Sequence, residues 1–434
     1  MRRMIQGALL GAVVTAFMVV AAPAWAGGNL VCASGCPFTQ IQPAISSVSP
    51  GTTIKIGPGK YVENLVVSKS VTLRGSGNST VIVPATSNPI CSPGSLCGGA
   101  ASNVILVEAN NVTITKLAID GNNPAISSGV VRGGVDIDAR NGIVTNHEVG
   151  TFNGLTVSKV KVADVYLRGI YASSGGTFDF THDTVENVQG EEQSIAMFAF
   201  EGAGEFTHDK VSRANDAISA NWSQGTKFLD NTITKSGSGI HTDNNGGSGG
   251  EADVIKGNKI KECTSDGYGI FVFVPYVSAT VESNKISGCS VGLAAYGGAV
   301  SGQGPTFAKN TVNGSGAAAT GATIGAYLTT DQLGFAFGDL TVTLKENTVE
   351  HFTTGLLATQ TEPTEGQPAG GQATVTATPA NSFFDDGTGA NGEPGTIVDA
   401  TEDWWGCAAG PNMGGRCSTV QGTPEFTPWR TSKP

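Results

Sequence analysis

Two aspartates two positions apart, Asp136 and Asp138, form the first pair whose residue types and spacing could support catalysis. On a β-strand such side chains share a face, and their Cα atoms lie about 6.6–7 Å apart. That spacing is compatible with an inverting glycosidase, in which a water molecule fits between acid and base. Arg132 and Arg140 flank the pair and could hold a uronate carboxylate. Two solvated aspartates, or a calcium site, are the simpler interpretation, so Ca²⁺ is the cofactor left open.

A second pair with the same spacing, His241 and Asp243, lies in the polar segment 239–245. Histidine can act as a general acid or base near neutral pH. An exposed histidine in a polar turn is the simpler alternative. Two other histidines, His182 and His208, each precede an aspartate in a Thr-His-Asp phrase. Stacked imidazoles could bind copper or zinc, but stacking at a turn without a metal is the better interpretation.

These residues belong to a repeat that must position them. A polar residue, usually Asn, is followed by a small or basic residue and then by Val or Ile, and this phrase returns every 22–27 residues in the middle of the chain. Its copies begin at Asp183, Asp209, Asn231, Asn258, Asn284 and Asn310, with later ones at Asn347 and Asn381. Three short strands per interval describe one coil of a parallel β-helix, a solenoid that buries inward Val, Ile and Leu between coils. The repeated Asn suits a turn whose side chain bonds the next coil or its own backbone.

The strand that follows each phrase is expected to present one continuous outward face. Alternation along the strand places aromatic and amide side chains on it beside the two candidate pairs. The outward residues expected to contact a substrate are Tyr171, Phe198, Asn221, Phe271, Phe273 and Tyr296. Such a mixture suits a glycan, which offers apolar ring faces and hydroxyls, although any β-helix surface carries ladders of this kind. Four coils separate the pairs by about 19 Å, so they cannot form one dyad.

The two ends of the chain are expected to cap the solenoid. Residues 39–42 have capping-box form and predict a short helix that ends at Pro50-Gly51. Trp404, Trp405 and Trp429 are expected to seal the last coil. The predicted organisation is therefore a leader over 1–26, an N-terminal cap over 27–50, the β-helix over 51–400 and a C-terminal Trp/Cys cap over 401–434.

The leader and the cysteines both indicate export. Arg2 and Arg3, an apolar run and small residues before Gly27 are typical of a secretory signal peptide. An even number of cysteines in an exported chain predicts disulfides. Pairing by proximity would join Cys32 with Cys36, Cys91 with Cys97, Cys263 with Cys289, and Cys407 with Cys417. We expect a secreted or periplasmic protein.

Composition excludes several classes of protein and partner. Charged residues make up 14% of the chain, too few for a coiled coil or a disordered acidic chain. The net charge of −11 argues against nucleic acid and anionic membranes as partners. No stretch after the leader is apolar and long enough to insert into a bilayer.

The chain resembles the right-handed parallel β-helix proteins of the pectate-lyase-like superfamily. The resemblance is carried by residues 38–45, 50–54, 57–63 and 70–75 near the start, by the repeats, and by 403–407, 410–412 and 428–429 near the end. It implies an all-β fold, a right-handed solenoid with a short N-terminal capping helix. The superfamily includes polysaccharide lyases, glycoside hydrolases, esterases, epimerases, tailspikes and adhesins, so the resemblance implies no catalytic residue. The expected function is polysaccharide binding with hydrolase or lyase action, and the alternative is a non-catalytic surface or matrix scaffold.

Overall fold

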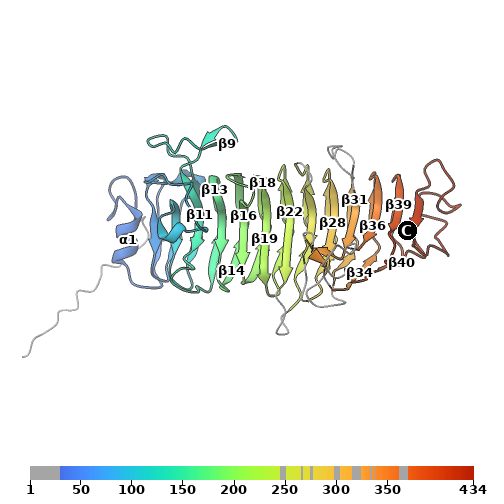
Figure 1. The fold of residues 1–434 in the computed structure, drawn as a ribbon. Coiled ribbons are helices and arrows are strands. Elements are labelled where there is room, and N and C mark those ends of the chain that lie inside the picture. The colour runs from blue at the N-terminus through green and yellow to red at the C-terminus, as the bar shows by residue number, and fades with distance from the viewer. Residues whose placement is uncertain are drawn as a thin grey trace, which may run out of the picture.

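The computed structural model describes residues 30–244, 251–264, 267–273, 277–297, 304–314, 324–332, 335–336, 338–360 and 370–434. The predicted signal peptide lies outside these residues. The described chain forms an elongated stack of coils that runs from helix α1 (Ile41–Ser47) to the C-terminal strands (Figure 1). The predicted right-handed parallel β-helix is confirmed, because neighbouring coils pair in parallel along the whole stack.

The first strand of each coil belongs to a sheet of 13 parallel strands in the described part of the chain. In order, they are β1 (Thr53–Lys55), β4 (Thr72–Arg74), β7 (Thr113–Thr115), β12 (Leu155–Ser158), β14 (Thr177–Thr181), β17 (Ala203–Thr207), β20 (Lys227–Leu229), β23 (Val254–Lys256), β26 (Thr280–Glu282), β29 (Thr306–Ala308), β34 (Leu340–Lys345), β37 (Ala373–Ala377) and β40 (Ile397–Asp399).

Wherever the repeated phrase occurs, the second strands begin at the second residue of the phrase. They are β2 (Gly59–Val62), β5 (Thr80–Val83), β8 (Ala118–Asp120), the start of β13 (Lys161–Ala172), β15 (Thr184–Val188), β18 (Lys210–Ala214), β21 (Thr232–Thr234), β24 (Lys259–Lys261), β27 (Lys285–Ser287), β30 (Thr311–Asn313), β35 (Thr348–Glu350) and β38 (Ser382–Phe384).

The third strands carry the face on which the candidate residues were expected. They are β3 (Leu65–Val67), β6 (Asn103–Val107), β11 (Ala139–Thr145), the end of β13, β16 (Ile195–Phe200), β19 (Asp216–Ser223), β22 (Ser238–Asn244), β25 (Tyr268–Val272), β28 (Val291–Tyr296), β31 (Ile324–Thr329), β36 (Thr354–Thr359), β39 (Thr388–Gly392) and β41 (Thr419–Gly422).

Inward side chains stack in register from coil to coil and form one continuous core. On the first strands Phe180 pairs with Phe206, and Phe206 with Phe228, and all three rings are fully buried. On the third strands Ile240 and Ile270 are likewise partners in register, and both side chains are buried. No coil could bury these side chains alone, so each coil is stabilised by its two neighbours.

The repeated polar residue forms a buried ladder through the stack. The backbone N–H of Asn258 donates to Oδ1 of Asn284 at 2.9 Å, and its Nδ2 donates to the same oxygen and to the carbonyl of Phe228. The same pattern runs from Asp183 to Asp403. The expectation that this side chain bonds the next coil is confirmed.

A glycine is the second residue of the third strands β22, β25, β28, β31, β36 and β39, where the chain turns a corner. A Cβ at Gly292 would meet Val312 Cγ1 at 2.1 Å, and one at Gly325 would meet Val349 Cγ1 at 2.2 Å. The small residue before each inward aliphatic side chain is therefore required because the backbone passes close to the second strand of a neighbouring coil.

Caps and covalent links agree with the expectations except at the helix N-terminus. Helix α1 begins without a side-chain cap of its own; instead, the Glu63 carboxylate accepts the N–H groups of Ile41 and Gln42. At the other end Trp405 is fully buried and stacks on Phe383 at 5.4 Å. All four predicted disulfides are formed: Cys32–Cys36, Cys91–Cys97, Cys263–Cys289 and Cys407–Cys417.

Other elements lie outside the coils. They are η1 (Gly77–Ser79), η2 (Cys97–Gly99), the antiparallel pair β9 (Val131–Arg132) and β10 (Val135–Asp136), and the pair β32 (Asp331–Gln332) and β33 (Phe335–Ala336). Among the described residues, no helix is long and apolar enough to cross a membrane.

Candidate functional site

The third strands carry two parallel outward rows, as the repeat predicted. In the first row Tyr171, Phe198, Ser219, His241 and Phe271 are partners on successive strands. The second row lies two positions further along each strand and includes Asn221, Asp243, Phe273 and Tyr296. The two rows therefore bring His241, Asp243, Phe271, Phe273 and Tyr296 onto one part of the face.

An aromatic cluster occupies the middle of this face, formed by Tyr268, Phe271, Phe273, Tyr296 and Tyr327. The Phe271 ring lies 5.0 Å from Tyr268, 5.3 Å from Phe273 and 4.9 Å from Tyr296, between ring centroids. The hydroxyls of Tyr268 and Tyr296 are 2.8 Å apart. All five rings are half-buried. Four of them pack on Val291 and Ala294, and the fifth, Phe273, lies against Phe271 and Tyr296. The cluster thus offers apolar ring faces with hydroxyl groups between them.

His241 lies at the edge of the aromatic cluster. Its imidazole stacks on Phe271 at 4.7 Å with an interplanar angle of 20°. The ring is half-exposed, but Nε2 is shielded from solvent and has no hydrogen-bond partner among the described residues. Burial lowers the pKa of His241, so the imidazole is neutral at pH 7.

Asp243 stands beside His241 in the second outward row. Its Oδ1 accepts the backbone N–H of Trp222 on the preceding coil. Burial, opposed by that hydrogen bond, raises the pKa of Asp243 to about 7. A half-exposed carboxyl that keeps its proton near neutral pH can serve as a general acid.

A second carboxylate, Asp253, holds the coil in place behind Asp243. Its two oxygens accept hydrogen bonds from Thr242, Ser223, Asn244 and the backbone N–H of Thr226. Burial raises the pKa of Asp253 while these donors lower it. The carboxylate of Asp253 therefore holds β22 in position through its hydrogen bonds, whereas the carboxyl group of Asp243 faces outward.

Tyr171 and Phe198, expected to contact a substrate, are covered in the structure. They stack at 4.7 Å in the first row, but each is only 6% exposed. Leu96, from the loop that contains the Cys91–Cys97 disulfide, packs in the same buried cluster. The expectation that these two rings are available to a ligand is wrong because a loop from an earlier coil lies over them.

Asp136 and Asp138 do not share a strand face. Asp136 ends the hairpin strand β10 and accepts hydrogen bonds from the hydroxyls of Ser127 and Ser128, which lower its pKa. Asp138 is fully buried, and its Oδ2 accepts the backbone N–H of Asn123 at 2.9 Å. The expected glycosidase-like pair is wrong because the repeat is interrupted here by a loop and a hairpin.

The two flanking arginines are bound to backbone carbonyls. The buried guanidinium of Arg140 donates to the carbonyls of Pro89, Gly94 and Ser95 at 2.8–3.0 Å, which ties down the loop that covers Tyr171. Arg132 donates through Nε to the carbonyl of Gly190 at 3.1 Å. Arg140 therefore cannot hold a uronate, and Arg132 is engaged in fixing the hairpin.

The stacked histidines are confirmed. The rings of His182 and His208 lie 4.9 Å apart at an interplanar angle of 8°. In the described part of the chain, no three His, Cys, Asp or Glu side chains form a group that could hold a metal ion.

The sequence reasoning missed Tyr268 and Tyr327 as members of the aromatic cluster. Tyr327 is the in-register partner of Ala294 in the first row, but the phrase preceding its coil starts at Asn310, and the longer interval hid the alignment. Tyr268 lies two positions before the inward Ile270, at the position where the chain turns into the third strand. Strict alternation places Tyr268 on the same side as the inward Ile270, so the strand pattern alone could not have found it.

Comparison with a family model supports the fold. Residues 141–312 match the family described as the right handed beta helix region. This match covers the coils that carry most of both outward rows.

Solved structures show the same fold at low sequence identity. The catalytic domain of a GH87 α-1,3-glucanase in complex with tetrasaccharides superposes with a TM-score of 0.58 at 14% identity, covering 89% of this chain and 71% of that one. The catalytic unit of the GH87 α-1,3-glucanase from Streptomyces thermodiastaticus strain HF3-3 gives 0.54 at 16% identity, covering 90% and 65%.

One sequence relative is a cell surface glycoprotein of Methanothermus fervidus. It is 36% identical over 91 residues, which is 20% of this chain. The matched segment spans 13% of that glycoprotein's length.

Proposed function

Because the chain is a right-handed parallel β-helix protein of the pectate-lyase-like type, we propose that it is an exported protein that binds a polysaccharide on the third-strand face. The observation that carries this proposal is the aromatic cluster, five half-buried rings in mutual contact on neighbouring coils. Sugar rings present apolar C–H faces that pack on aromatic rings, while their hydroxyls need polar partners such as tyrosine O–H groups.

The structural relatives support a glycan as the ligand. One GH87 glucanase with this fold is in complex with tetrasaccharides. The four disulfides support export, since disulfides persist in oxidising compartments. Both a secreted and a periplasmic location provide such an oxidising environment.

We further propose that the protein acts on the bound chain with Asp243 as proton donor. The carboxyl keeps its proton near neutral pH because burial raises its pKa to about 7. Asp243 would give its proton to the glycosidic oxygen as that C–O bond breaks. Water would form the new C–O bond and release a proton to the solvent, from which the carboxylate is reprotonated. His241, stacked on Phe271, would fix the ring against which the sugar packs.

The test is a screen of the mature protein on neutral and acidic polysaccharides, with and without calcium. Binding, new reducing ends and absorbance of an unsaturated product are measured together. The variant Phe271→Ala/Tyr296→Ala should weaken binding at least tenfold, and Asp243→Asn should abolish turnover but keep binding. Phe384→Ala, a half-exposed ring on β38 outside the cluster, is the control and should bind normally. Unchanged binding in Phe271→Ala/Tyr296→Ala would refute the site.

The second candidate is a non-catalytic surface scaffold. It is favoured by the partial likeness to a cell surface glycoprotein and by the structural use of Asp138 and Arg140. Binding on the aromatic cluster without any turnover across the panel would select this function over the first.

A further inference from the structure

A line of basic side chains follows one corner of the stack near its N-terminal end. On each coil, the second strand lies between this corner and the third-strand face that carries the aromatic cluster. The strands β1, β4, β7, β12, β14 and β17 are successive neighbours in the first sheet. The residues at or just after their ends are Lys55, Arg74, Lys116, Lys159, His182 and His208. Arg74 is in register with Lys55 and with Thr115, so the four residues from Lys116 to His208 lie one position beyond that register. Adjacent coils are about 4.8 Å apart, and the six residues form a basic track along the corner with one residue per coil.

The four lysine and arginine side chains of the basic track form no ion pair within the described part of the chain. They are Lys55, Arg74, Lys116 and Lys159. Further along the stack the pattern changes. Lys256 lies 3.0 Å from Glu282, and Lys309 lies 4.0 Å from Glu346.

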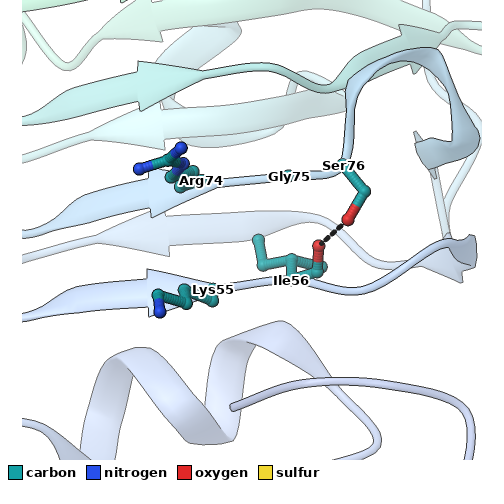
Figure 2. Close-up of a pocket in the computed structure, with 5 residues that line it drawn as sticks. All are labelled: Lys55, Ile56, Arg74, Gly75 and Ser76. Carbon is teal, nitrogen blue, oxygen red and sulfur yellow. Dashed lines mark hydrogen bonds between the residues drawn. The ribbon is translucent and has the colours of Figure 1, made fainter. Parts of the chain in front are cut away.

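The surface is hollowed at two places along the track. Lys55 and Arg74, in-register partners on β1 and β4, line one hollow with Ile56, Gly75 and Ser76 (Figure 2). Both long side chains extend to the same side of the sheet, clear of the hydrogen bond from Ser76 to the Ile56 carbonyl. A second hollow is lined by Asn78, Lys159, Val160, Lys161, His182 and Thr184.

The neighbours of the track are hydroxyls. Thr115, Ser158 and Thr181 end β7, β12 and β14 directly before Lys116, Lys159 and His182. The track ends on the next coil, where Asp230 takes the corner position and its carboxylate lies 3.9 Å from His208 Nε2. A row of cations interleaved with hydroxyls suits a ligand that carries both anionic groups and hydroxyl groups.

We propose that the basic track binds an acidic polysaccharide, with its carboxylate or sulfate groups on Lys55, Arg74, Lys116 and Lys159 and its hydroxyls against the threonine and serine side chains. One coil per step is comparable with the length of one pyranose residue in an extended chain. Single-stranded nucleic acid, also a linear polyanion, is recognised by aromatic rings on which bases stack, and the residues of the track and the strand ends beside it include no Phe, Tyr or Trp.

This inference goes beyond the proposed function and does not depend on it. The net charge of −11 repels a polyanion at long range. Binding is therefore expected to be local and strongly dependent on salt.

The experiment measures the Kd of the mature protein for dextran sulfate and polygalacturonate, with neutral dextran as reference, between 20 and 200 mM NaCl. The variant Lys55→Gln/Arg74→Gln/Lys116→Gln/Lys159→Gln should bind at least tenfold more weakly. The slope of log Kd against log salt should become shallower by about one unit per charge removed. The control Lys259→Gln/Lys285→Gln/Lys309→Gln/Lys345→Gln removes the same charge from later coils and should bind within about twofold of the wild type.

Equal losses in both quadruple variants would overturn the track in favour of a general effect of charge. Tighter binding of a single-stranded DNA oligonucleotide than of either acidic glycan would overturn the ligand class. Phe271→Ala/Tyr296→Ala should leave the slope of log Kd against log salt unchanged, whereas the quadruple variant of the track should reduce it. The slope therefore distinguishes a failure of the track from a failure of the aromatic site. Thermal unfolding of each variant checks that the solenoid is intact.

Discussion

At the scale of single residues, the ladder that runs through the stack contains both amides and acids. Asn231 Nδ2 donates to the carbonyl of Phe206 at 2.9 Å, but the corresponding atom of Asp209, Oδ2, is buried without a partner. Burial raises the pKa of Asp209 well above its ordinary value. The raised pKa favours the protonated carboxyl, which can match the donor and acceptor of the amide that stands at this position on other coils.

The variant Asp209→Asn should be more stable than the wild type at neutral and alkaline pH. A carboxyl with a raised pKa binds more protons in the folded state than in the unfolded state, so stability falls as pH rises above the ordinary carboxyl range. The amide removes that dependence and completes the ladder, which should be worth about 1–3 kcal/mol at pH 8. Urea unfolding at pH 5 and pH 8 measures the difference.

The reciprocal variant, Asn258→Asp, is the control for this account. It should introduce a loss of stability with rising pH that the wild-type chain lacks at that coil. A pH dependence that is the same in Asp209→Asn and in the wild type would show that other groups determine it.

The pH dependence of turnover reports on Asp243. A proton donor works in its acid form, and its pKa is about 7, so kcat on a cleaved glycan should fall as pH rises through 7. Asp243→Glu should keep part of the activity and move the pH at which kcat falls, because the longer side chain places the carboxyl group in a differently buried position. A rate that stays flat from pH 6 to 9 would contradict the assignment.

The outward aromatic residues could be predicted from the sequence, but their accessibility could not. Phe271, Phe273 and Tyr296 follow from strand alternation, and the structure places them as expected. Tyr171 obeys the same alternation yet is covered by a loop that Arg140 holds down, a contact between segments about 75 residues apart that no local pattern encodes. Asp136 was misplaced because the strand period was extended through a hairpin.

At the scale of elements, the corner glycines test how closely neighbouring strands approach. Gly292→Ala would place a Cβ 2.1 Å from Val312 Cγ1 and 2.7 Å from the carbonyl of Gly325. We expect a destabilisation of about 1–3 kcal/mol, the range found for overpacked cores, seen as a lower urea midpoint. Gly150→Ala is the matched control, since its Cβ would meet only Phe152 Cζ at 3.9 Å, and it should change stability by less than about 0.5 kcal/mol.

The order of the coils from Asp183 onward follows from the repeated phrase, because its polar residue and its aliphatic residue are each required by the stack. The coils before Asp183 are not marked by the phrase. The cap of helix α1 could not be predicted in this way. The start of this helix matches a capping box in sequence, but the carboxylate that caps it belongs to Glu63. A cap supplied from 22 residues away cannot be predicted from the helix itself.

At the scale of the whole molecule, the C-terminal cap covers the last edge of the stack. Removal of residues 401–434 would expose the ring of Phe383, which stacks on Trp405, and leave Asn381 without its partner Asp403. Open strand edges and apolar surface promote association. The truncated protein should form oligomers by light scattering at concentrations where the full chain is monodisperse; equal masses for the two would show that the last coil closes itself.

The asparagine ladder also bears on how such a molecule can change in length. Each asparagine donates hydrogen bonds to Oδ1 of the asparagine on the next coil and accepts the same bonds from the asparagine on the preceding coil. The donors therefore point in one direction along the stack. A tandem duplication within the gene that copies one repeat would therefore insert a coil whose buried groups are satisfied at once. The molecule can lengthen by about 4.8 Å per repeat while both caps and the existing binding faces keep their immediate surroundings, which makes internal duplication an open route for its evolution.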